Sequence, residues 1–388
     1  MGYRLSKSKY GRGLNCAKAL WLTIHAREEE APPSAAQSYR FEQGIAVGLK
    51  AQERFPGGQA IETPSYAADR ALRETRAALE GTAPALFEAA FAHDNTLVRV
   101  DVLRRLPRAQ WELIEVKSTT SVKPEHVPDL AVQRHVLEGC GLAVPRAVLM
   151  HLNSRCEHPN LEELFELEEI TAAVREEQRQ VPATLERFHR VLASTAEPVV
   201  PVGPHCDAPY ECPFKAHCWA VVPGVSIFNI PRLGTEAKRE LAAAGRLSLE
   251  DLPPAYPLSA PQAAFVEMVR SGQPKIDAAT IRLLLATLSF PLYFLDFETD
   301  APAIPRLPGM RPFQPLPFQF SVHVLRAPRG PRAEGLLEHR EHLHGDPEDP
   351  RPELARALIE AVGEEGSIVA YNAAFERGVL EALASQVP

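Results

Sequence analysis

Two carboxylates and one ammonium group occur in neighbouring segments whose patterns indicate β-strands. Residues 96–104 alternate between apolar and polar side chains, and residues 111–118 do the same. Because strand side chains repeat every two residues, Glu115 and Lys117 point to the same side. The turn between the two segments predicts a hairpin that brings Asp101 to that side as well. Carboxylate oxygens bind Mg²⁺ or Mn²⁺, and a nearby lysine can activate water or neutralise charge on a phosphate.

The segment after this hairpin predicts a helix with a polar residue in its apolar stripe. Over residues 126–141, Leu130, Gln133 and Leu137 recur at helical spacing. A buried glutamine needs a hydrogen-bond partner, which is either the carboxylate site or the helix backbone. For the hairpin itself, the alternative is that its charged residues lie on the solvent-facing side of an antiparallel pair.

Asp101 followed by Glu115-x-Lys117 resembles the active-site pattern of the PD-(D/E)XK nucleases, in particular their RecB-like branch. The resemblance implies that Asp101 and Glu115 hold Mg²⁺ or Mn²⁺ and that Lys117 assists phosphodiester hydrolysis. In that branch a glutamine on the next helix lies beside the metal, which implies this role for Gln133. A tyrosine usually follows four residues later, whereas this chain has Leu137.

Four of the six cysteines flank this region. Cys206, Cys212 and Cys218 follow one another at equal intervals, and Cys16 lies far upstream. Cysteines of an intracellular chain favour metal ligation over disulfides, and thiolates select iron–sulfur clusters or zinc. The arrangement resembles the iron–sulfur nucleases of the AddB and CRISPR-associated RecB-like exonuclease type. In those enzymes four thiolates hold a [4Fe–4S] cluster that joins the two ends of the domain; zinc and unligated thiols are the alternatives here.

A second pair of carboxylates lies near the end of the chain. Asp296 and Glu298 share one face of an apolar, aromatic-rich strand. The Asp-x-Glu pattern resembles the DEDD exonucleases of the ribonuclease H-like fold, whose two metal ions are held by such a pair. Glu376 matches the acid of their second motif, where Asp is usual. The third motif would follow Pro388, so we expect a domain that is truncated or degenerate.

The composition is typical of a globular α/β protein with more than one domain. The 388 residues are 45% hydrophobic and 24% charged, with a net charge of −8 that argues against indiscriminate coating of nucleic acid. No segment has the length of a membrane span or secretory core, so we expect a cytoplasmic protein. The first 26 residues contain no acid and suit a phosphate-facing patch, or are simply a solvated terminus. Their basic residues are Arg4, Lys7, Lys9, Arg12 and Lys18.

These patterns predict three domains. Residues 1–222 form an α/β restriction-endonuclease-like core with the cysteine clasp, and residues 289–388 form the partial ribonuclease H-like domain. Between them, residues 223–288 show a turn, a helix starting near Thr235, a glycine stop at Gly245 and a second short helix. This pattern is similar to helix–hairpin–helix modules that bind nucleic-acid backbones, and a helical linker is the alternative. The whole arrangement resembles an uncharacterised bacterial family with a C-terminal domain of unknown function.

The leading interpretation is a metal-dependent DNA nuclease that acts as an exonuclease on single-stranded DNA, in repair, recombination or defence. Asp101 and Glu115 would bind the ion, Lys117 would act on water or phosphate, and Gln133 would steady the site. The alternative is a nucleic-acid-binding platform that has lost catalysis, since Gly48 stands where related nucleases carry a metal-binding histidine. A redox-sensing iron–sulfur protein is the third interpretation.

Overall fold

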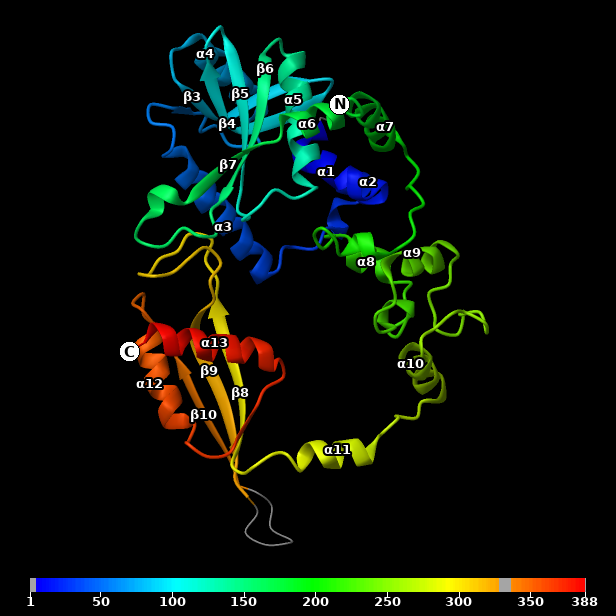
Figure 1. The fold of residues 1–388 in the computed structure, drawn as a ribbon. Coiled ribbons are helices and arrows are strands. Elements are labelled where there is room, and N and C mark those ends of the chain that lie inside the picture. Colours follow the sequence, from blue (N-terminus) through cyan, green and yellow to red (C-terminus); the bar gives the residue numbers. More distant parts are fainter. Residues whose placement is uncertain (1–4, 328–335, 388) are drawn as a thin grey trace. The chain divides into compact units, whose positions relative to one another are not determined.

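The computed structural model describes residues 5–327 and 336–387, which form a mixed α/β protein, as expected. The chain divides into two compact units (Figure 1). The first unit comprises Met1–Leu152 and Phe165–Pro274, and the second comprises Asn153–Leu164 and Lys275–Pro388. Among the described residues, no helix combines the length and apolar character needed to cross a membrane.

A seven-stranded mixed sheet forms the centre of the first unit. Its main order is β2-β3-β4-β5-β6-β7, and β1 pairs with β4 in parallel. The expected hairpin between residues 96–104 and 111–118 is confirmed as the antiparallel pair β4–β5. β5 and β6 run parallel, and helix α5 provides the crossover between them. The strands are β1 Leu5–Ser6, β2 Gln59–Ala60, β3 Ala85–His93, β4 Thr96–Leu106, β5 Gln110–Lys117, β6 Ala143–Leu152 and β7 Phe165–Glu169.

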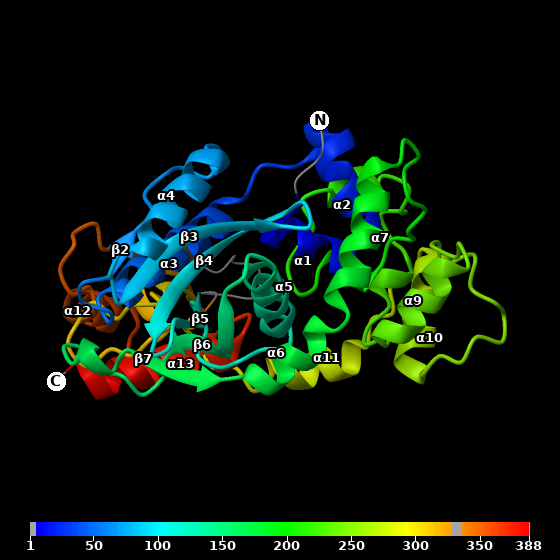
Figure 2. The ribbon, with the colours of Figure 1, turned by 90° about the horizontal axis from the view of Figure 1, so that it is seen from above.

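Helices cover this sheet and share one apolar core with it. Tyr10, Leu130 and Phe188, from three different helices, belong to the same buried cluster as Leu86 of β3. Figure 2 shows α4 lying along β3 and α5 beside β6. The helices of the first unit, of which α9 and α10 pack in a separate apolar cluster, are α1 Lys7–Asn15, α2 Ala17–His25, α3 Ala35–Gln52, α4 Ala68–Glu80, α5 His126–Gly139, α6 Thr171–Gln178, α7 Val181–Ala193, α8 Lys215–Trp219, α9 Thr235–Ala243 and α10 Ala260–Ser271.

Helix α5 follows the sequence pattern closely. Leu130, Gln133 and Leu137 are all completely buried, as the apolar stripe predicts. The helix ends at Gly139, and Gly141 adopts a φ of 86°, a left-handed conformation that glycine tolerates and that commonly ends helices. The buried stripe therefore fixes which side of α5 faces the sheet, and with it the direction of the Gln133 side chain.

Within residues 223–288, the structure differs from the sequence prediction after the first helix. Helix α9 begins at Thr235 and Gly245 has a φ of 71°, as the pattern indicates. The prediction of a second short helix is wrong, because residues 246–252 form a turn in which the Ser248 backbone N–H donates to Asp251 Oδ2. Prolines at 253 and 254 disfavour a continuing helix there, and the next helix is α10.

The second unit contains a four-stranded sheet in the order β10-β9-β8-β11. Tyr293, Leu295 and Phe297 are buried on one face of β8, which confirms the predicted strand and its alternation. They pack with residues of α12 and α13, and Figure 1 shows α13 crossing the sheet. The elements are α11 Ala278–Leu285, β8 Leu292–Asp300, β9 Leu316–Leu325, β10 Leu337–Leu343, α12 Arg351–Ala361, β11 Ser367–Val369 and α13 Ala373–Gln386.

Candidate functional site

Asp101 and Glu115 lie opposite each other on adjacent strands. The β4–β5 register pairs Val102 with Ile114, and its continuation sets Asp101 across from Glu115. The Asp101 Oδ2 atom accepts a hydrogen bond of 2.8 Å from the backbone N–H of Val116. Burial, together with the charge of Glu115, raises the pKa of Asp101 to about 7. Its side chain is still 24% exposed, so one carboxylate of the pair remains open to an ion from solvent.

Glu115 is the most heavily bonded group of the site, with a side chain only 1% exposed. Its Oε1 atom lies 2.8 Å from Lys7 Nζ and 2.9 Å from Lys117 Nζ, and Gln133 Nε2 donates to Oε2 at 2.7 Å. Burial alone would raise the pKa of Glu115, but the charges of Lys7 and Lys117 outweigh it and hold the pKa at about 2. Glu115 is therefore a carboxylate at neutral pH.

Lys117 lies between two acids. Its Nζ atom is 2.9 Å from Glu115 Oε1 and 2.6 Å from Asp129 Oδ2. Burial lowers the pKa of Lys117, but the charges of Glu115 and Asp129 raise it well above its ordinary value. The Lys117 side chain thus stays cationic, which suits neutralising a phosphate or orienting water better than accepting a proton.

Gln133 connects the helix to the strand site. Its Nε2 atom donates to Glu115 Oε2 and to the Asp129 backbone carbonyl, at 2.7 and 3.0 Å. Both partners that the sequence left open, the carboxylate site and the helix backbone, are therefore used. Its Oε1 atom is buried and has no hydrogen-bond partner among the described residues, which leaves one acceptor available for a ligand.

Three further charged residues belong to this site and were missed at the sequence level. Lys7, assigned only to the basic patch, pairs with Glu115. Asp129 precedes Gln133 by one helical turn, and that spacing could have revealed it. Glu88 on β3 lies opposite Asp101, because the neighbouring pairs set residue 87 across from 102 and 89 across from 100. Its charge contributes to the raised pKa of Asp101.

Glu88 also has an unusual backbone for a strand residue. Its φ is 54°, in the left-handed region that non-glycine residues rarely adopt. The side chain is 47% exposed and its Oε2 atom lies 3.4 Å from Arg99 Nε. Glu88, Asp101 and Glu115 thus form a row of carboxylates across three strands, and strained residues of this kind concentrate at functional sites.

Gly48 lies on helix α3, which contacts β5. At Gly48, an added Cβ would meet no atom within 4 Å. The position therefore has room for a side chain, although this chain supplies none.

The four flanking cysteines lie around one pocket. Cys16 precedes α2, and Cys206 ends a 3-10 turn. Cys212 lies in the loop that follows, and Cys218 lies on α8. All four line a single pocket together with Phe214. Within the described chain, the groups of three or more metal-binding donors that lie within 4.8 Å of one another contain no cysteine.

The three acids of the second unit do not converge. Asp296 and Glu298 are exposed on one face of β8, as the two-residue spacing predicts. Glu376 is only 4% exposed and lies on α13 in line with Val379 and Leu383, which pack on the opposite, apolar face of β8. The structure therefore brings Asp296 and Glu298 together and leaves Glu376 apart from them.

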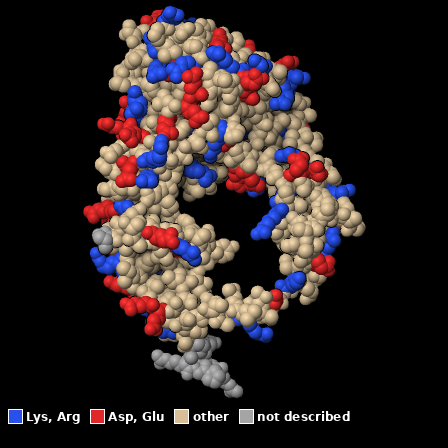
Figure 3. Space-filling model, viewed as in Figure 1, with Lys and Arg blue, Asp and Glu red and all other residues tan. Residues whose placement is uncertain are grey.

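Acidic and basic side chains are intermixed over the face shown in Figure 3, and no extended field of one sign covers it. This distribution agrees with the acidic net charge of −8. Any contact with a nucleic-acid backbone on this face depends on local cationic groups rather than on a broad basic surface.

Comparison with known proteins finds one family model that matches part of the second unit. Residues 293–388 match the family described as "Domain of unknown function (DUF2779)". A solved structure described as "Crystal structure of SSO0001" aligns with 57% of this chain and 89% of that chain, at 13% sequence identity and a TM-score of 0.26. No curated protein matches the chain.

Proposed function

We propose that the first unit is a metal-dependent nuclease of the RecB-like PD-(D/E)XK type, which hydrolyses phosphodiester bonds of single-stranded DNA from an end. One observation carries the proposal: Asp101, Glu115 and Lys117 meet on adjacent strands, and Gln133 of the next helix donates a hydrogen bond to Glu115. A solvent-facing set of charges would not explain why Glu115 is 1% exposed and bonded on both oxygens.

Each residue has a distinct task in this proposal. Asp101 and Glu115 hold Mg²⁺ or Mn²⁺, which when bound polarises the phosphate and lowers the pKa of water. Lys117 stabilises negative charge that develops on the phosphate oxygens, because its neighbours keep it protonated. Gln133 positions Glu115 through the bond from Nε2, and a ligand held in this way by a neighbouring donor is better oriented for metal binding.

We also propose that Cys16, Cys206, Cys212 and Cys218 hold a [4Fe–4S] cluster. The pocket that they share joins the segment after α1 to the segment after α7, and thiolates are ligands that select iron–sulfur clusters. Asn15 supports the same connection, since its Nδ2 atom donates to the His205 carbonyl at 2.8 Å. Such a clasp would hold α1, and therefore Lys7, against the carboxylate site.

The second unit is proposed to be a ribonuclease H-like domain. Asp296 and Glu298 present two carboxylates on one exposed face of β8, which supports a metal site there. Glu376 does not join them, so we assign the cleavage chemistry to the first unit. Residues 223–288 are proposed to be a helical linker, the alternative to a helix–hairpin–helix module, because residues 246–252 form a turn in place of the second short helix and the next helix is α10.

The experiment is cleavage of end-labelled single-stranded DNA by anaerobically purified full-length protein with Mn²⁺. Asp101→Asn and Lys117→Ala are expected to lower the rate at least a hundredfold, while Asp296→Asn, a matched change in the second unit, leaves it unaltered. Melting curves of each variant control for folding. Equal cleavage by Asp101→Asn and the unaltered protein would remove the assignment.

A nucleic-acid-binding platform without catalysis is the second candidate. It is favoured by the glycine at position 48 and by the cationic Lys7 side chain, whose Nζ already neutralises Glu115. Calorimetric titration with Mn²⁺ separates the two functions. Heat of binding that disappears in Asp101→Asn supports the nuclease, whereas intact DNA affinity without Mn²⁺ binding at millimolar concentration supports the platform.

A further inference from the structure

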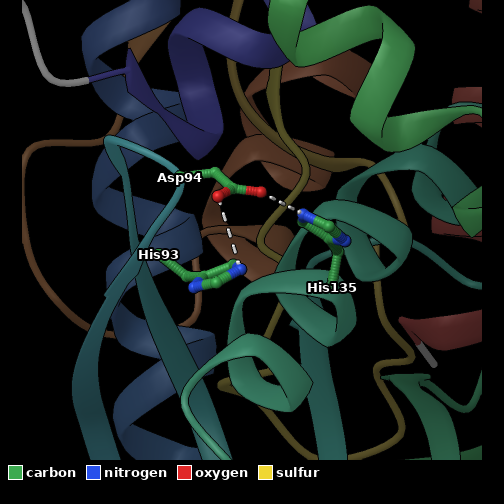
Figure 4. Close-up of side chains that lie close together, drawn as sticks. All are labelled: His93, Asp94 and His135. Carbon is green, nitrogen blue, oxygen red and sulfur yellow. Dashed lines mark hydrogen bonds and ion pairs between the residues drawn. The ribbon is translucent and has the colours of Figure 1, made fainter.

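Three metal-binding side chains meet at the turn between β3 and β4. His93 is the last residue of β3, Asp94 is the first turn residue, and His135 lies on α5. Figure 4 shows both imidazole rings directed at the Asp94 carboxylate. Asp94 Oδ1 is 3.4 Å from His93 Nε2 and Oδ2 is 3.1 Å from His135 Nε2. The three donor atoms all lie within 4.8 Å of one another.

The turn that carries Asp94 is held in place through its backbone carbonyl groups, which bond to other parts of the chain. Asp94 and Asn95 have φ values of 47° and 53°, which is the conformation of a tight two-residue hairpin turn and is tolerated best by Asp, Asn and Gly. The Asp94 carbonyl oxygen lies 3.0 Å from His189 Nε2, and the Asn95 carbonyl accepts from the backbone N–H of Leu5 at 3.0 Å. The carboxylate of Asp94 is thus positioned without using its own oxygens to close the turn.

A glycine on α5 allows His93 to approach the helix. An added Cβ at Gly139 would lie 2.1 Å from His93 Cδ2, well inside van der Waals contact. The ring of His93 therefore occupies the space that any other residue at 139 would fill, and its centroid lies 5.7 Å from that of His135. Glycine near a helix end destabilises the helix by up to about 1 kcal/mol relative to alanine, and this is the cost of the close approach of His93.

We propose that His93, Asp94 and His135 bind a divalent transition-metal ion of the zinc type, at a site separate from the Asp101–Glu115 centre. Two imidazoles and one carboxylate are a ligand set for zinc that leaves a coordination position for water, whereas Mg²⁺ and Ca²⁺ prefer oxygen ligands alone. Side-chain exposures of 36%, 52% and 16% for His93, Asp94 and His135 give an ion access from solvent. The observation does not depend on the nuclease proposal.

The consequence of such an ion would be structural. It would join the β3–β4 hairpin, which carries Asp101, to α5, which carries Gln133. An ion that binds only the folded chain stabilises that chain in proportion to the logarithm of its concentration above Kd. The metal therefore serves as a clip that fixes the helix against the sheet.

Co²⁺ and Zn²⁺ are the probes, added to the full-length protein in excess Mg²⁺ so that the carboxylate centre is supplied with its own ion. We expect visible Co²⁺ absorption without the near-ultraviolet thiolate band that binding by cysteines would give. His135→Gln and His93→Gln are each expected to weaken Zn²⁺ binding at least tenfold and to remove this absorption. His344→Gln is the matched control, because His342, His344 and Glu353 form the other such group among the described residues.

Thermal unfolding provides a second measurement, in which Zn²⁺ binding is detected as a rise in Tm of the folded protein. Zn²⁺ is expected to raise Tm of the unaltered protein and of His344→Gln, and to leave Tm of His135→Gln unchanged. Gly139→Ala displaces His93 without removing a ligand, and we expect it to weaken Zn²⁺ binding as well. Unchanged Zn²⁺ affinity in both His93→Gln and His135→Gln overturns the proposal, whatever the outcome of the DNA-cleavage assay.

Discussion

Lys7 and Glu115 form an ion pair in which Nζ lies 2.8 Å from Oε1, although 108 positions separate them in the chain. The same Nζ is 3.8 Å from Asp101 Oδ1. An ammonium group thus neutralises both carboxylates that we propose as metal ligands. A divalent ion binding there competes with Lys7 for the same negative charge, since a carboxylate oxygen that binds the ion gives up part of its attraction to the lysine.

Replacing this lysine should therefore make metal binding stronger. Lys7→Met keeps the length of the side chain and removes its charge, and we expect Mn²⁺ affinity measured by calorimetry to rise about tenfold. Without metal the variant should be less stable by about 3 kcal/mol, because the buried Glu115 loses one of its partners. Lys9→Met, on the same helix, is the control and should change neither quantity. Weaker Mn²⁺ binding in Lys7→Met would show that Lys7 assists the ion instead of competing with it.

Gln133 should matter for metal binding more than for folding. Gln133→Met removes the donor to Glu115 Oε2 while preserving the shape of the buried side chain. Losing such a positioning contact typically weakens metal affinity about 10- to 100-fold. The free energy of unfolding should fall by about 1–3 kcal/mol, because a buried carboxylate oxygen is left without that donor. Denaturant titration and Mn²⁺ calorimetry of one preparation compare the two effects, and a loss of stability with unchanged Mn²⁺ affinity would contradict the positioning role.

Local periodicity explains what the sequence could predict. The valines at 98, 100 and 102 are buried and the intervening residues are partly exposed, so a period of two identified β4 and the side on which Asp101 lies. The same rule placed Asp296 and Glu298 together on β8. Helical spacing likewise identified the buried face of α5 that includes Gln133.

The features that the sequence could not predict depend on contacts between segments that are far apart in the chain. The approach of Lys7 to Glu115 depends on β1 pairing with β4, which no local pattern encodes. The position of Glu376 depends on which face of the second sheet α13 covers, and its sequence motif contains no information on that choice. The strained φ of Glu88 is equally invisible in a strand whose composition is apolar.

The open space at Gly48 allows a gain-of-function test. Gly48→His introduces a metal-binding side chain at a position where the new Cβ meets no atom within 4 Å. Histidine also replaces glycine within helix α3, which favours the helix by a few tenths of a kcal/mol. We expect tighter Mn²⁺ binding and faster cleavage of single-stranded DNA. Gly44→His, one turn earlier on the same helix and equally open, is the control. Equal effects of the two substitutions would indicate that α3 does not face the carboxylates as proposed.

The cysteine pocket makes the most direct prediction, because it links two ends of the first unit. Anaerobically purified protein should be brown and contain about four irons per chain. Cys16→Ser should lose the colour and most of the iron, and it should melt at a lower temperature because α1 and the segment after α7 are no longer joined. Cys140→Ser is the matched control, since this cysteine is exposed and lies outside the pocket. Iron analysis and the visible spectrum decide the matter: colourless protein with one zinc per chain would replace the cluster with a mononuclear site, and iron retained by Cys16→Ser would exclude Cys16 as a ligand.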